Sequence, residues 1–224
     1  LTESDISVDS PTNNFPTWNP LNKNANIAFS EGNLAMVGAD ASYRASISTM
    51  AAPSGKWYAE FDAVSGMSGS DKSVGIYRAD INYDDDRGLG NYPEGTTWSY
   101  AAHGLVRKAG TTQDTEATFT DGDIIQVAMD LDNDKLYFGK NNVWINSGDP
   151  TTGATGTGAY AITSATGIPY HFAATTINAS GAAKWIANFG QDSSFAGNKT
   201  AQGNQDGNDI GDFYYTPPTD FLAL

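Results

Sequence analysis

Alternation of apolar and polar residues between Asp121 and Asn142 is the feature that most constrains how this chain can fold. In the first half of the stretch every second residue is apolar, at Ile125, Val127, Met129 and Leu131, and the residues between them are Gln126, Ala128 and Asp130. This period of two predicts a strand with one face in a core and one face in solvent.

A second strand follows directly, so the stretch predicts a hairpin. Asn133 and Asp134 tolerate a positive φ and are the expected central residues of a two-residue turn. This turn predicts the cross-strand pairs Asp132 with Lys135, Leu131 with Leu136 and Met129 with Phe138, and places Asp130 opposite Tyr137 on the outer face.

Similar short strands recur along the chain. They are expected at 26–30, 33–37, 42–48, 55–64, 73–78, 97–102, 168–174 and 183–189, and no segment has a convincing helical period. We therefore expect an all-β fold, a sandwich of two antiparallel sheets with long loops rich in Gly, Asn and Asp. Residues 18–224 form one domain in this interpretation, and residues 1–17, with Pro11 and Pro16, form an extended arm or linker.

The charge balance excludes some classes of partner. The 224 residues carry 12 Lys and Arg against 26 Asp and Glu, a formal net charge of -14. Such a surface repels phosphate backbones and anionic membranes, so we expect neither nucleic-acid binding nor membrane insertion. There is no cysteine, so disulfides and thiolate metal sites are excluded and the fold depends on packing and backbone pairing.

Several segments, in order, resemble the SPRY (B30.2-like) domain. They are Gly-Lys-Trp-Tyr-Ala-Glu-Phe at 55–61, Val-Gly-Ile at 74–76, Trp-Ser-Tyr at 98–100, the stretch at 121–132, and Ala-Asn-Phe-Gly at 187–190. The start at Trp18-Asn19-Pro20 and the end at 215–224 are similar to SPRY modules of phage, other viral or bacterial structural proteins. Lys140-Asn141-Asn142 departs from the family's usual Lys-Asn-Gly, a tolerable change because Asn also adopts left-handed conformations.

This resemblance implies a concanavalin A-like sandwich that acts as a binding module without catalysis. Such a module recognises a host-surface glycan or protein through its loops, and its expected location is a virion or the cell surface. The loops after Trp144 and after Phe189 are longer than usual for the family, so contact positions there cannot be transferred.

A glycan hydrolase of the concanavalin-like fold is the less favoured alternative. Retaining glycosidases of this fold place a Glu-x-Asp pair and a second Glu on one strand. Glu60 and Asp62 supply the pair, but Val64, Ser65 and Gly66 stand where the second Glu is needed. His103 and His171 are the only histidines, and no Gly-x-Ser-x-Gly elbow accompanies them.

The loop at 80–95 carries most of the candidate binding residues. Asp84, Asp85 and Asp86 form either a solvated acidic loop tip or a calcium site, with Arg87 as an alternative source of compensating charge. Asp130, Asp132 and Asp134 match the start of an EF-hand, but Lys135 replaces the required Gly, so we interpret them as a hairpin. No other cofactor is expected.

Exposed aromatic residues complete the predicted site, since sugars and peptide anchors stack on rings. We expect Tyr83, Tyr92 and Trp144 to be exposed in loops, and Trp57, Trp98, Trp185 and Phe189 to lie in the core. An alternative to recognition is a purely structural role in a virion or surface assembly. The 1–17 arm would then dock the protein to other subunits or to copies of itself.

Overall fold

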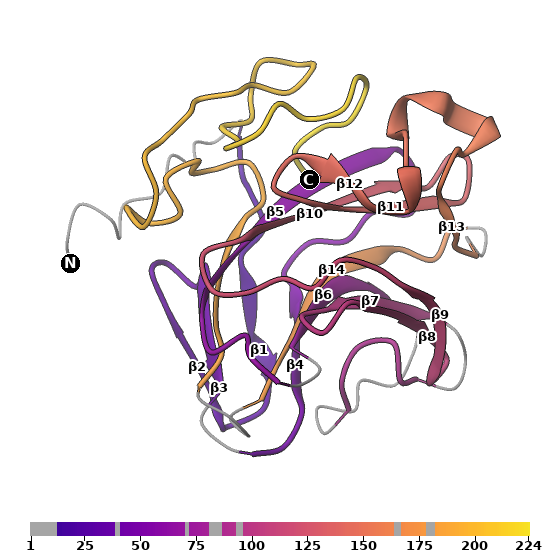
Figure 1. The fold of residues 1–224 in the computed structure, drawn as a ribbon. Coiled ribbons are helices and arrows are strands. Elements are labelled where there is room, and N and C mark those ends of the chain that lie inside the picture. The colour runs from indigo at the N-terminus through magenta and orange to yellow at the C-terminus, as the bar shows by residue number, and fades with distance from the viewer. Residues whose placement is uncertain are drawn as a thin grey trace.

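Two antiparallel sheets packed face to face form the protein, as the sequence predicts (Figure 1). The structure is a computed structural model that describes residues 13–38, 41–69, 72–80, 87–92, 96–163, 167–177 and 182–224. In this part of the chain no helix is both long enough and apolar enough to cross a membrane.

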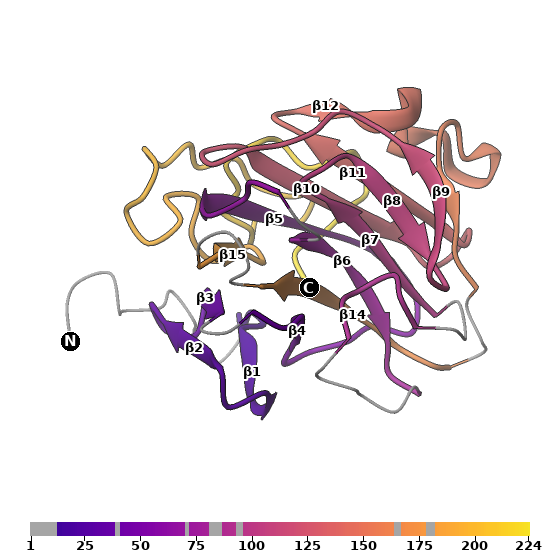
Figure 2. The ribbon, with the colours of Figure 1, turned by 60° about the horizontal axis from the view of Figure 1, so that its bottom comes forward.

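The first sheet has seven strands. Their order is β1 (Trp18–Lys23), β4 (Arg44–Ser48), β14 (Tyr170–Thr176), β6 (Ser73–Arg78), β7 (Thr97–Ala101), β8 (Leu105–Lys108) and β9 (Thr111–Thr115). Figure 2 shows β6, β7, β8 and β9 side by side, ending at the edge strand β9.

The second sheet has eight strands. Its order is β12 (Val143–Trp144), β11 (Lys135–Lys140), β10 (Ile124–Asp130), β5 (Lys56–Ser65), β15 (Lys184–Asn188), β3 (Ala35–Gly38) and β2 (Ile27–Ser30), and β13 (Tyr160–Ala161) also pairs with β11. Between β12 and β13 lie two short 3-10 helices, η2 (Ile145–Ser147) and η3 (Pro150–Thr155), where the sequence predicted a loop.

The main core lies between the two sheets, because the alternating apolar residues of both point inward. Phe61 of β5 meets Phe172 of β14 across the interface, with ring centroids 6.4 Å apart. Trp98, Trp185 and Phe189 are buried as predicted, and Trp57 is half-buried against the same core.

The central hairpin forms, but the predicted register is wrong. Met129 pairs with Leu136 and Asp130 with Lys135, which leaves residues 131–134 as the loop. The longer loop is stabilised by the Asp130 carboxylate, which accepts hydrogen bonds from the backbone N–H of Asn133 at 3.0 Å and from its side-chain amide at 2.8 Å. Because each partner moves by two positions, every side chain keeps its predicted face.

The prediction that the outer face of this hairpin is in solvent is also wrong. Gln126, Ala128 and Asp130 are all buried. Residues 189–224, orange to yellow in Figure 1, run over this side of the second sheet, where Phe213 and Phe221 pack with Ala128. The ring of Phe213 packs edge-on against Tyr58, with centroids 5.0 Å apart. The sandwich therefore has a third layer on this face, made of irregular chain.

Strands with clear alternation were predicted well, whereas β1, β8 and β9 were not predicted. β1 contains Pro20, and β9 consists of polar and mostly exposed residues, so neither shows a buried face in the sequence. Phe15 and Pro16, at the end of the expected N-terminal arm, are buried, and the side-chain amide of Gln191 donates to the carbonyl oxygen of Pro16 at 2.8 Å.

Candidate functional site

The predicted site residues fall into three groups. Tyr83, Asp84, Asp85 and Asp86, with the expected calcium site, lie outside the described residues. Among the described residues there is no group of three or more His, Cys, Asp or Glu side chains that could hold a metal ion.

Tyr92 is buried, with 2% of its surface exposed, so the prediction of an exposed loop position is wrong. The 87–92 segment folds onto the outer face of the first sheet, where the Leu89 N–H donates to the Thr175 hydroxyl at 2.8 Å. The Tyr92 ring packs edge-on against Tyr77 at 5.3 Å between centroids. Arg87 remains exposed, with its guanidinium carbon 5.9 Å from the centroid of the Tyr92 ring.

Trp144 lies on the outer face of the other sheet. Its indole packs edge-on against Tyr58 at 6.5 Å and against Tyr137 at 6.4 Å between centroids. The prediction of an exposed loop position is therefore wrong for Trp144, which is half-buried on the short strand β12. The structure therefore separates Trp144 from Arg87 and Tyr92, which the sequence analysis had grouped as one site.

A tight turn presents Trp144 and its neighbour Val143. Asn141 and Asn142 have φ values of 49° and 65°, so both adopt the left-handed conformation expected of Asn at this turn. Lys140 then pairs with Val143. Val143 is 68% exposed, whereas Trp144 lies over Gly139, where an added Cβ would come within 3.2 Å of the indole. The glycine thus provides the space that the indole occupies.

These residues border a groove of about 430 Å³, which we call the Trp144 groove. One wall is the extended chain that follows β9, and the other is the end of β11 with the β12–η2 segment. Its lining residues are Glu116, Ala117, Lys140, Val143, Trp144, Ile145, Asn146 and Ser147.

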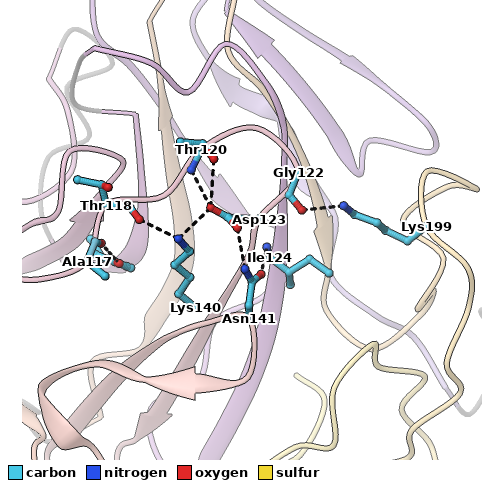
Figure 3. Close-up of polar contacts among 10 residues, drawn as sticks. Ala117, Thr118, Thr120, Gly122, Asp123, Ile124, Lys140, Asn141 and Lys199 are labelled. Atoms are coloured by element: carbon cyan, nitrogen blue, oxygen red, sulfur yellow. Dashed lines mark hydrogen bonds and ion pairs between the residues drawn. The ribbon is translucent and has the colours of Figure 1, made fainter.

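Polar contacts hold the two walls in place (Figure 3). The Lys140 ammonium donates to the Thr118 carbonyl oxygen at 2.9 Å and pairs with the Asp123 carboxylate at 3.1 Å. Asp123 also accepts from the Thr120 N–H at 2.8 Å and from the side-chain amide of Asn141 at 2.6 Å. Lys140 therefore ties the chain after β9 to β11, and its charge is already compensated.

The rim of the groove on the β9 side is acidic. The Tyr160 hydroxyl donates to the Asp114 carboxylate at 3.3 Å, and Glu116 follows two residues later on the same side of the extended chain. Partial burial raises the pKa of Glu116; a hydrogen bond from the backbone N–H of Asn146 acts in the opposite direction, and the neighbouring Asp114 carboxylate raises the pKa further. In the part of the chain that the structure describes, no Lys, Arg or His lies within ion-pair distance of either carboxylate.

Of this site, the sequence analysis identified only Trp144. It missed Val143, Asp114 and Glu116, because an exposed Val in a hairpin and acids in a polar strand have no distinguishing pattern. The only available signal was the turn Asn141-Asn142 directly before two large apolar residues.

Glu60 and Asp62, the pair considered for glycoside hydrolysis, lie away from the Trp144 groove. Both are fully buried on the outer face of β5, beneath residues 189–224. The Glu60 carboxylate accepts hydrogen bonds from the backbone N–H groups of Tyr214 at 2.8 Å and Tyr215 at 2.7 Å. The Glu60 carboxylate therefore helps to hold residues 189–224 against the second sheet.

Comparisons with known proteins agree with this architecture. The SPRY domain family model matches residues 56–167, which is half of the chain. Among solved structures, the SPRY domain of human HERC1 is similar, with a TM-score of 0.56 and 16% sequence identity over 76% of this chain and 96% of that one, and it supports the fold. No curated protein matches the sequence. SPRY domains are generally non-enzymatic modules of protein interaction, and this chain belongs to the SPRY domain family.

Proposed function

We propose that this protein is a recognition module that binds a protein or a glycan in the Trp144 groove. The observation that carries the proposal is the exposed Val143 beside the half-buried Trp144, both presented at the mouth of an open groove. Binding surfaces concentrate their energy in such aromatic and apolar anchors. The turn at Asn141-Asn142 and the contacts of Lys140 keep the anchors in place before binding, which reduces the entropic cost of association.

We further propose that the module belongs to a virion or cell-surface structural protein. The support is the likeness of the ends of the domain, at 18–20 and 215–224, to SPRY modules of viral and bacterial structural proteins. A second candidate function is docking into such an assembly through the N-terminal arm. Leu21, which is 96% exposed on the edge strand β1 next to the arm, is an apolar side chain available for such a contact.

Two probe sets test the recognition site: a glycan array and a display library of random twelve-residue peptides. We expect members of at least one set to bind the wild-type protein and to lose binding to the Trp144→Ala and Val143→Ser variants. Val143→Ser is included because Val143 is exposed, so its loss should leave the fold intact. Leu21→Ser is the matched control. Ligands that bind all three variants equally would refute the proposed site.

Calcium binding by Asp84, Asp85 and Asp86 also stays a proposal, supported by the mutual repulsion of three consecutive carboxylates. Calorimetric titration with calcium chloride should show saturable binding that a triple Asp→Asn variant loses. The absence of heat in the wild-type protein would show that the loop is a solvated acidic tip. Titration of the Tyr83→Ala and Arg87→Ala variants with the selected glycan or peptide ligands would test these two residues as contact residues.

A further inference from the structure

We propose that the Trp144 groove takes an extended peptide segment of a partner protein, in which a large apolar side chain lies next to a lysine or arginine. This inference rests on the proposed recognition function and specifies its ligand. It follows from the two kinds of surface that meet in the groove, one apolar and one acidic.

The apolar surface lies on the hairpin side. Val143 and Trp144 are followed by Ile145, which is 8% exposed and lines the same groove. An apolar side chain placed here would cover Val143 and the open part of the Trp144 indole, and would remove both from water. A neutral sugar would use the indole face but would leave Val143 and the acidic rim without complementary groups.

The acidic surface lies on the opposite wall. Glu116 lines the groove, and Asp114 lies beside it, just outside the lining. Both are half-buried and close enough to repel each other, and no cationic side chain of the described chain pairs with them; Glu116 accepts only the backbone N–H of Asn146 from the facing wall. Lys140, the cation that lines the groove, is already bound to Asp123 and Thr118. A guanidinium or ammonium group from a ligand would relieve this repulsion, and the net charge of -14 would attract a basic segment over longer distances.

The free edge of the first sheet favours an extended peptide over other basic ligands. β9 pairs with β8 on one side, and no described strand pairs with its other side. Glu116 follows β9 directly and lines the groove. A peptide that lies along this edge can form main-chain hydrogen bonds there while one side chain reaches Trp144 and the next reaches Glu116. A second copy of this chain is disfavoured, because its own charge is also -14.

Selection from the random twelve-residue library tests this inference directly, with the full chain as bait and Trp144→Ala for counter-selection. We expect enriched peptides to carry Lys or Arg within two residues of a large apolar residue. The enriched peptides are then synthesised with a fluorescent label, and fluorescence anisotropy measures their affinity for the protein. We expect about tenfold weaker binding to the Asp114→Asn/Glu116→Gln double variant than to the wild-type protein, and weaker binding to the wild-type protein in high salt. Glu31→Gln, on the turn next to the opposite edge strand β2, removes one carboxylate away from the groove; it is the charge-matched control for Glu116→Gln alone and should bind normally.

The outcomes separate the two proposals. Trp144-dependent peptides without basic residues, with unchanged affinity for the double variant, would overturn this inference and leave the recognition function intact. Trp144-dependent binding of glycans alone would also overturn this inference and leave the recognition function intact. Self-association that is lost in Trp144→Ala would have the same two consequences. If no ligand depends on Trp144, both proposals fail. Thermal unfolding shows whether the double variant is folded. If it is not folded, the affinity of the peptides for Glu116→Gln alone and the salt dependence of wild-type binding test whether the ligand pairs with the acidic wall.

Discussion

Replacing Glu60 by glutamine should remove a large part of the pH dependence of stability in this protein. Glu60 is fully buried on β5 under residues 189–224. Besides the N–H groups of Tyr214 and Tyr215, its carboxylate accepts a hydrogen bond from the Tyr58 hydroxyl at 2.9 Å. No ion pair of Glu60 is formed among the described residues, so burial is opposed by hydrogen bonds only.

The size and sign of the effect follow from the pKa of this group. Burial raises the pKa of Glu60 from 4.5 to about 7. Its four hydrogen bonds, the three named above and one from the side-chain amide of Asn188, act in the opposite direction. Below pH 4.5 the carboxyl is protonated in the folded and unfolded states alike. Between pH 4.5 and 7 only the folded state keeps the proton. The contribution of protonated Glu60 to the free energy of unfolding therefore falls as pH rises, and it is lost above pH 7. Between pH 5 and pH 8 this amounts to about 2–3 kcal/mol.

Urea unfolding followed by tryptophan fluorescence at pH 5, 6, 7 and 8 measures this contribution. The free energy of unfolding of the wild-type protein minus that of Glu60→Gln should decrease by about 2–3 kcal/mol over this range. Burial also raises the pKa of Asp62, but Asp62 is present in both proteins, so its effect largely cancels in the difference. Glu31→Gln is the control for the loss of a carboxylate outside the buried cluster. A difference between wild type and Glu60→Gln that is constant from pH 5 to pH 8 would refute the reasoning.

Three further substitutions test the fold. Phe213→Ala should cost about 3–5 kcal/mol in urea unfolding, because the buried ring anchors the covering chain; a loss below about 1 kcal/mol would show that this chain is not packed on the sheet. Gly75→Ala should prevent soluble expression, because the new Cβ would overlap the Trp98 carbonyl oxygen between β6 and β7. A soluble variant with the wild-type melting temperature would contradict this prediction. Asn142→Gly should raise stability by about 0.5 kcal/mol, since glycine adopts the φ of 65° freely, and a lower melting temperature would argue against the assigned turn.

Strand positions were predictable where alternation is strong. The predicted strand 73–78 coincides with β6, and the segment at 55–64 differs from β5 by one residue at each end. The left-handed turn at Asn141-Asn142 was also readable, because few residues tolerate a positive φ at two successive positions. These features depend on interactions between neighbours in the chain, and such interactions are encoded locally.

The parts of the site that sequence reasoning missed depend on contacts between distant segments. Tyr92 was expected in solvent, but its burial depends on the Tyr77 ring and on the hydrogen bond from the Leu89 N–H to Thr175 of β14. The Trp144 groove joins residues 116–117 to residues 143–147 through the contact of Lys140 with Thr118. No local pattern in either segment identifies the other as its partner.

By itself, the sequence determined that this protein is a β-sandwich, which residues of each central strand share a face, and that the chain turns at Asn141-Asn142. Only the tertiary structure decided what covers each face. Alternation shows that a strand has two different sides, but a polar residue such as Glu60 or Gln126 can lie in water or beneath another segment that supplies its hydrogen bonds. For Glu60 the backbone N–H groups of Tyr214 and Tyr215 supply them, and these residues lie more than 150 positions away in the chain.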